Sequence, residues 1–439
     1  MAGKVLRYSL AMLGVAGVAM WLGAVALAAA PTPKEQALRE ELLKLNSAGT
    51  EEVQNAKLRE LLKNRAKAKE LVAEANKMMK EAKDDEKPFN LNGTAILGRA
   101  AQILKLNDVA EKFYEHQISL ATKLKSGQKI LLAYENLIDL YFDTKRYQDA
   151  IDKCEQVMDM RGPKEVERAK PFILERIVQA TARQGKIDQA MSMTKNLLQA
   201  TENNWYFLQL RGWVEREAGK TDDAITTYKE VIDKLDADKE LKTDKDKIKD
   251  RVRYTLSGLY VENKDIDKAA KELQTLIKRL PATPETDEDI RRLATYKNDL
   301  GFIWCDHNMN LDESEKLIKE ALELDKKEKE KLKKEGKLED VKPNAAYLDS
   351  LGWVYFQQKK YKEALEPLKQ ATADEEDGNH LEIFDHLADC YTKLGMKKEA
   401  IAAWEKGLKM EDLSKRDAER RRKVSEKLRD ARKDAKAKD

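Results

Sequence analysis

The sequence predicts an all-α protein that folds as a solenoid of about eight helix pairs. Charged residues make up 37% of the 439 residues, and the chain contains only 19 glycines and 9 prolines. A compact β or α/β enzyme uses more of both residues in its turns, whereas Ala, Leu, Lys and Glu favour helices with wide solvated faces. A short phrase also recurs along the chain, as expected of stacked repeats that share a thin hydrophobic core.

The recurring phrase consists of a turn, a pair of polar or charged residues and then a small residue. The small residue is Ala, or once Ser, at positions 110, 150, 190, 224, 269, 314, 364 and 400. About 11–12 residues earlier stands a small or branched residue followed three positions later by a large one, most clearly in Leu351-Gly352-x-x-Tyr355 before Ala364. Only Gly, Ala or Ser lets two helices cross closely, so each phrase predicts a first helix A packed on an antiparallel second helix B.

These residues resemble the tetratricopeptide-repeat (TPR) family. In the best repeat the signature positions are occupied by Leu348, Leu351, Gly352, Tyr355, Ala364, Leu368 and Ala371. Steps between successive phrases range from 34 residues (190 to 224) to 50 residues (314 to 364), which indicates insertions between repeats. The resemblance implies a right-handed TPR solenoid over residues 90–412. The last three repeats look like exported or outer-membrane-associated bacterial TPR proteins, which implies a role as a scaffold or assembly factor.

The segments that flank the repeats are also predicted to be helical. In residues 29–89, Lys34–Asn46 and Glu51–Lys83 have apolar residues at helical spacing and form an N-terminal helical hairpin cap or, as an alternative, a coiled coil. Residues 413–439 are predicted to be a basic C-terminal helix or tail. The lysine-rich segment 325–343 is interpreted as a solvated extension between two repeats.

Residues 1–28 are predicted to be a targeting segment. Lys4 and Arg7 precede an uncharged apolar run from Leu10 to Leu27, and Ala26-Leu27-Ala28 provides the small-x-small pattern that a signal peptidase cleaves. The run is longer than the usual signal core and reaches the lower limit for a helix that crosses a membrane. A cleaved signal peptide and a retained membrane anchor therefore both stay open, and either one places the repeats outside the cytoplasm, in the periplasm or associated with the cell envelope.

The sequence contains no signature of a catalytic site, a metal site or a cofactor site. Its three cysteines form no CxxC pair, its four histidines are scattered, and no phosphate-binding glycine loop or HExxH motif occurs. From Lys415 to Asp439 there are twelve Lys/Arg and six Asp/Glu, so the basic charge is concentrated in the tail. A dedicated nucleic-acid binder carries that charge on its folded face, which argues against a nucleic-acid partner.

The candidate binding residues lie on the inner faces of the A helices. In the TPR family these faces line a concave groove that is not needed for packing the pair. The position after the signature Gly is aromatic in three repeats, and neighbouring polar residues map to the same face. These aromatic residues are either anchors for a partner or side chains that insertions or the next helix cover. The predicted partner-binding residues are Tyr206, Trp213, Arg216, Tyr254, Asn298, Phe302, Asp306, Asp349, Trp353 and Phe356.

The sequence therefore predicts a non-catalytic scaffold or adaptor of the cell envelope that binds a protein or peptide. Aromatic anchors with polar neighbours are typical of such grooves. The alternative is a membrane-anchored structural or spacer protein in which residues 1–28 form the tether.

Overall fold

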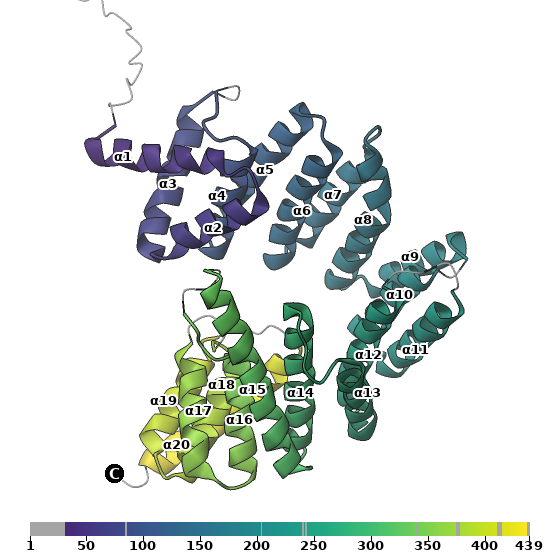
Figure 1. The fold of residues 1–439 in the computed structure, drawn as a ribbon, viewed down its shortest axis with the longest axis vertical. Coiled ribbons are helices and arrows are strands. Elements are labelled where there is room, and N and C mark those ends of the chain that lie inside the picture. Colours follow the sequence, from purple (N-terminus) through teal and green to yellow (C-terminus); the bar gives the residue numbers. More distant parts are fainter. Residues whose placement is uncertain are drawn as a thin grey trace, which may run out of the picture. The chain divides into compact units, whose positions relative to one another are not determined.

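The computed structural model describes residues 31–83, 86–202, 204–238, 241, 244–336, 338, 340–374, 378–410 and 415–436. Over these residues the chain consists of α-helices and one short 3-10 helix, with no β-strand, which confirms the predicted all-α class (Figure 1). The predicted signal peptide or anchor, residues 1–28, lies outside the described residues. Within the described ranges no helix is both long enough and apolar enough to cross a membrane.

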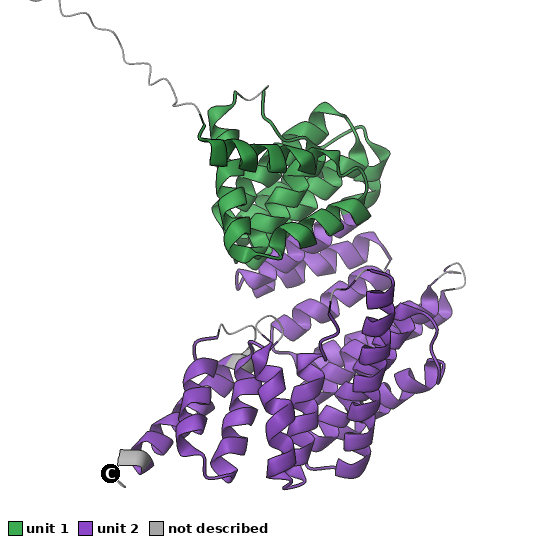
Figure 2. Cartoon of the chain, turned by 60° about the vertical axis from the view of Figure 1, so that its left-hand side comes forward, with its two compact units in different colours: residues 1–170 green, residues 171–439 purple. Residues whose placement is uncertain are grey.

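The chain divides into two compact units, residues 1–170 and residues 171–439 (Figure 2). The boundary falls within α8 (Lys164–Arg183), directly before Pro171. Each unit is described separately below.

Unit 1 begins with the helices that precede the first helix pair. They are α1 (Pro33–Leu43), the 3-10 helix η1 (Lys44–Ser47), α2 (Glu51–Leu62) and α3 (Arg65–Glu81). α1 starts at a capping box in which Thr32 and Glu35 each accept from the other's backbone N–H. The second predicted helix is interrupted because the Asn64 side chain caps α3. Two helix pairs follow, α4 (Leu91–Ile103) with α5 (Asn107–Lys123) and α6 (Gly127–Asp143) with α7 (Tyr147–Asp159).

Unit 2 contains six further pairs and a final helix. The pairs are α8 with α9 (Ile187–Ala200), α10 (Trp205–Glu217) with α11 (Thr221–Ala237), α12 (Lys245–Glu262) with α13 (Ile266–Arg279), α14 (Asp287–Asp306) with α15 (Leu311–Lys334), α16 (Ala345–Gln357) with α17 (Tyr361–Ala373), and α18 (Leu381–Lys393) with α19 (Lys397–Gly407). The chain ends in α20 (Lys415–Lys436). The described chain thus contains the eight predicted pairs.

The repeated small residues lie where the two helices of each pair cross. All eight of them, from Ala110 to Ala400, are 0% or 1% exposed. Opposite Ala364, a methyl group added at Gly352 would come within 2.8 Å of the Leu368 side chain, so the crossing leaves no room for a Cβ atom. The recurring phrase therefore reflects close helix packing.

The turns between helix A and helix B share one conformation. In each of the eight turns one residue adopts a left-handed backbone with φ between 54° and 81°, and the next N–H returns to a carbonyl near the end of helix A. This arrangement ends a helix by satisfying its last free carbonyls. Gly185, Gly219 and Gly395 adopt it without strain, whereas Lys or Asn occupies the position in the other five turns.

The segment 325–343, predicted to be a solvated extension, has mostly exposed side chains among its described residues, but it is helical as far as Lys334 and carries two buried acids. α15 continues to Lys334 and remains packed on its partner helix. Asp325 and Glu328 are 8% and 5% exposed. Arg291 of α14 pairs with Glu328, and the backbone N–H of Asn344 donates to Asp325 Oδ2 at 3.1 Å. Asp325 and Glu328 turn inward while most of the lysines are exposed, a distinction that composition alone does not reveal.

Candidate functional site

All ten predicted binding residues lie in unit 2, on the A helices of four consecutive pairs. α10 carries Tyr206, Trp213 and Arg216, and α12 carries Tyr254. The remaining six lie on α14 and α16: Asn298, Phe302, Asp306, Asp349, Trp353 and Phe356. The structure thus places the predicted set on neighbouring helices, and the contacts below show which members it brings together.

The residues of α10 contact the A helices on either side. The Tyr206 hydroxyl donates to Glu175 of α8, and burial followed by this hydrogen bond raises the pKa of Tyr206. Arg216 Nε donates to Glu262 of α12 at 3.0 Å. The Arg183 guanidinium lies 5.6 Å from the centre of the Trp213 ring. These three residues therefore join α8, α10 and α12 and remain partly or largely exposed.

Tyr254 links α12 to α14. Its hydroxyl donates to Asp299 Oδ2 at 2.6 Å, and its ring lies 5.4 Å from that of Tyr296. Burial raises the pKa of the Asp299 carboxyl, although the hydrogen bonds from Tyr254 and Asn298 lower it. Tyr254 is 38% exposed, whereas Asn298 is 6% exposed and its Oδ1 has no hydrogen-bond partner. Tyr254 is thus accessible to a partner, and Asn298 lies beneath the surface.

Trp353 is the centre of a second group of side chains. Its indole N–H donates to Asp306 Oδ1 of α14 at 3.1 Å. Its ring stacks on Phe356 at 4.8 Å and on His386 of α18 at 4.0 Å. Phe302 lies 6.3 Å from the same imidazole. One indole thereby joins α14, α16 and α18, and only 9% of it is exposed.

His386 is the functional residue of this group that the sequence analysis did not identify. Its Nδ1 lies 2.9 Å and 3.0 Å from the two carboxylate oxygens of Asp349. Burial alone would lower the pKa of His386, but the Asp349 carboxylate outweighs it and raises the pKa above the usual value. His386 stands two positions before the signature Ala388, in the same register as Asp299 before Gly301. A search for polar residues two positions before the signature small residue would have identified His386.

Exposure divides the predicted residues into two classes. The first class is buried: Asn298, Asp349 and Trp353 are each less than 10% exposed and lie beneath the surface of the A helices. The members that reach solvent, partly or fully, are Tyr206, Trp213, Arg216, Tyr254, Phe302, Asp306 and Phe356. Only the second class is accessible from solvent without a rearrangement of the helices.

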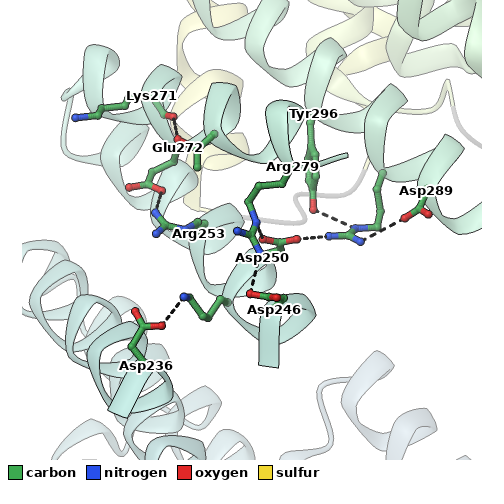
Figure 3. Close-up of polar contacts among 12 residues, drawn as sticks. Asp236, Asp246, Asp250, Arg253, Lys271, Glu272, Arg279, Asp289 and Tyr296 are labelled. Atoms are coloured by element: carbon green, nitrogen blue, oxygen red, sulfur yellow. Dashed lines mark hydrogen bonds and ion pairs between the residues drawn. The ribbon is translucent and has the colours of Figure 1, made fainter. Parts of the chain in front are cut away.

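A network of charges fixes α12 against its neighbours (Figure 3). Asp250, which is 6% exposed, accepts from Arg279 Nε at 2.6 Å and from Arg292 at 2.8 Å. Arg253 pairs with Glu272 of α13 at 2.8 Å. Because the carboxylate of Asp250 has a cation from both α13 and α14, its burial is compensated.

A groove of about 1020 Å³ lies beside α14 and α15. Its lining includes Leu293 and Leu324, together with Lys and Glu side chains of α15 in equal numbers. Its lining shares no residue with the predicted set, so it is separate from the A-helix face.

The chemistry of the described residues offers no obvious reactive centre. Over the described part of the chain no group of three or more His, Cys, Asp or Glu is placed to hold a metal ion. Cys154, Cys305 and Cys390 are all buried, and burial raises the pKa of the Cys390 thiol to about 11. A buried thiol with a raised pKa is a poor nucleophile.

Two family models match segments of unit 2. The model described as Tetratricopeptide repeat matches residues 207–234, within α10 and α11. The model described as Anaphase-promoting complex, cyclosome, subunit 3 matches residues 327–407, from the end of α15 through α19. Comparison with curated proteins gave no match.

Similar solved structures have low sequence identity. A tetratricopeptide repeat protein from Parabacteroides merdae is 15% identical, with 66% of this chain and 98% of that chain covered and a TM-score of 0.42. BtubC from P. vanneervenii is 17% identical, with 53% and 89% covered and a TM-score of 0.37. The apo form of RapI is 16% identical, with 65% and 77% covered and a TM-score of 0.45.

The family assignment rests on the matching family models and on the repeated pairs themselves. Each pair has a buried small residue at the crossing and the same left-handed turn between its helices. The chain therefore contains tetratricopeptide-like repeats, which the family models recognise over residues 207–234 and 327–407.

Proposed function

We propose that this chain is a non-catalytic scaffold or adaptor of the cell envelope, which binds a protein or peptide on the A-helix face of unit 2. TPR proteins generally act as scaffolds for protein–protein interaction, and stacked helices present extended surfaces for this purpose. The observation that carries the proposal is the series of side-chain contacts between consecutive A helices: Arg216–Glu262, Tyr254–Asp299 and Asp306–Trp353.

These contacts hold the partly exposed aromatic residues in fixed positions before a partner arrives. Tyr254, Phe302 and Phe356 are accessible, and each is packed against a ring of a neighbouring residue. A preorganised surface loses less conformational entropy when it binds. Aromatic anchors of this kind commonly cost about 2 kcal/mol or more of binding free energy when truncated.

The test is capture of partners from the protein's own envelope fraction by the full-length chain. Tyr254→Ala with Phe302→Ala is expected to lose the partners that the wild-type chain captures, while thermal unfolding remains close to wild type. Leu365→Ala on the B helix α17, also only partly buried, serves as a matched control and should retain them. Retention of the full partner set by the Tyr254/Phe302 variant would place binding on another face.

Export is a separate part of the proposal and has its own test. Mass spectrometry of the mature protein is expected to find an N-terminus near Ala29, as a cleaved signal predicts. A mature chain that still contains residues 1–28 would instead support the membrane-anchored structural or spacer protein.

A further inference from the structure

The last helix, α20, turns one narrow face toward the repeats. Among its described side chains the covered or partly covered positions are Arg420, Arg421, Val424, Lys427, Leu428 and Ala431. This spacing of three and four residues is that of one helix face. The face combines cations with apolar residues, whereas the other described side chains of the helix are exposed.

The cations of this face meet acids on the A helix α18. Lys427 Nζ lies 2.8 Å from Asp385 Oδ1 and 2.7 Å from Asp389 Oδ2. Arg420 pairs with Glu382 and lies 3.6 Å from Asp385 Oδ2. Asp385 is 4% exposed and also accepts the indole N–H of Trp404 at 2.9 Å. Buried carboxylates are stable only with such partners, so this face of α18 requires a cationic neighbour.

The apolar residues of α20 complete the contact. Val424 is 0% exposed and Leu428 is 7% exposed. Both belong to the hydrophobic cluster that contains Ala388 and Cys390 of α18 and Trp404 of α19. The site on α18 and α19 therefore has a shallow apolar centre beside an acidic edge.

The same relation joins consecutive A helices elsewhere in unit 2. Asp250 of α12 accepts from Arg292 of α14, and Asp349 of α16 contacts His386 of α18. α20 thus takes the place of a following A helix. Among its described side chains it does so with two buried apolar residues, whereas α18 buries six, including Leu381, Ile383, Phe384 and Leu387. A helix held by little apolar area and by ion pairs opens at a lower free energy than the helices of the core.

We infer that the acidic face of α18 is a docking site for a basic amphipathic helix of a partner protein, and that α20 occupies this site in the free chain. The partner helix carries Arg or Lys at two positions seven residues apart, with Val or Leu four and eight residues after the first. This is the chemistry of Arg420, Val424, Lys427 and Leu428. The inference rests on the proposed function, because it assigns a partner to the C-terminal end of the same A-helix face.

The test measures binding of a fluorescein-labelled peptide with the sequence of residues 415–436 to three full-length chains, by fluorescence anisotropy. Arg420→Glu with Lys427→Glu weakens the chain's own α20 and is expected to bind the peptide at least tenfold more tightly than the wild-type chain, because more of the site is free. The matched control, Lys423→Glu with Arg429→Glu, changes the same charge on side chains that are 59% and 62% exposed and should behave as wild type.

Two further measurements guard against a variant that simply unfolds. Adding Asp385→Asn and Asp389→Asn to the Arg420/Lys427 variant should weaken peptide binding at least tenfold at unchanged helical content by circular dichroism. In the wild-type chain, saturating unlabelled peptide should speed amide hydrogen exchange within α20 and leave that of α16 unchanged. Equal affinity of all chains for the peptide, or α20 exchange that does not respond to it, would overturn the inference.

This test separates the inference from the proposed function. Tyr254→Ala with Phe302→Ala should leave peptide binding unchanged, since neither residue contacts α20. Loss of envelope partners in that variant without any peptide binding would refute the docking site and support the proposed function. The opposite result is peptide binding that depends on Asp385 and Asp389, together with partner capture that does not depend on Tyr254 and Phe302. That result would refute the proposed face and support the docking site.

Discussion

The imidazole of His386 stacks on the indole of Trp353, with ring centroids 4.0 Å apart and planes inclined by 13°. The two residues come from consecutive A helices, α18 and α16. The indole N–H reaches back to Asp306 of α14, and the imidazole is held by Asp349 of α16. Three repeats are therefore joined through side chains on the A-helix face, in addition to the packing at each pair's crossing.

Replacing Trp353 with Ala is expected to destabilise unit 2. Removal of a buried aromatic side chain commonly costs about 3–5 kcal/mol of unfolding free energy, and here it also removes the indole hydrogen bond to Asp306. Trp353→Phe keeps the stack and should cost less. Urea unfolding monitored by circular dichroism measures both. Trp213→Ala, at a partly exposed position, is the control; an equal loss in the two alanine variants would contradict a special role for Trp353.

The sequence predicted Trp353 as a residue of the A-helix face, either an accessible anchor or a side chain covered by an insertion or by the next helix, and the structure shows it covered. The prediction followed from its place after Gly352, which correctly points the side chain away from the helix crossing. The cover is supplied by His386 of the next repeat and by Phe356 one turn later. Contacts between repeats depend on how far each helix is displaced from the last, and insertions of variable length hide that displacement from a single sequence.

The pKa of His386 is expected to lie above its ordinary value of about 6.5. The raised pKa means that protonated His386 stabilises the fold. This contribution is complete below the ordinary pKa and is lost as the pH rises through the folded value. Asp349→Asn removes the carboxylate that raises the pKa and should lower it. Titration of the histidine ring protons by NMR in the wild-type chain and in Asp349→Asn measures the shift. An unchanged His386 titration in Asp349→Asn would contradict the assignment.

Two glycines in A helices should respond to alanine in opposite directions. At Gly352 a Cβ atom would come within 2.8 Å of Leu368 and 3.2 Å of the Ala364 carbonyl oxygen, so Gly352→Ala should cost about 1–3 kcal/mol by overpacking. At Gly258, inside α12, nothing lies within 4 Å, and Gly258→Ala should stabilise by about 0.5–1 kcal/mol. Thermal unfolding of both variants measures whether each substitution stabilises or destabilises the fold. A stabilising Gly352→Ala would show that the crossing is looser than the structure indicates.

The composition of the C-terminal helix predicted its charge and its solvent exposure but not its packing on α18 and α19. Twelve Lys/Arg in residues 415–439 predicted a solvated basic helix or tail, and most of its described side chains are indeed exposed. Val424 and Leu428 alone mark the packed face, and two apolar residues give too weak a periodicity to predict a docked helix. The helix pairs were predictable because small residues recur at every crossing. The acid–cation pairs between A helices were not predictable, because the sequence does not distinguish a buried charged residue from the many exposed ones around it.

Asp250 is expected to stabilise the packing of α12 against α14. Its carboxylate accepts from Arg279 at 2.6 Å and from Arg292 at 2.8 Å. Removing a buried partner leaves charges uncompensated, so Asp250→Ala should cost about 2 kcal/mol or more of unfolding free energy. In a double-mutant cycle with Arg292→Ala, whose side chain is 20% exposed, the coupling should be about 1–2 kcal/mol, because the single and double variants lose the same interaction.

The control for this cycle is a solvent-exposed ion pair of the same network. Asp246 is paired with Arg279 at 3.0 Å, but its side chain is 78% exposed. Water and salt screen such a pair, so the Asp246–Arg279 coupling should be close to zero and should vanish at high salt. Urea unfolding at low and high salt measures both cycles. If the Asp250–Arg292 coupling also vanished with salt, the pair would behave as a surface ion pair, and the burial of Asp250 would not be what holds α12 against α14.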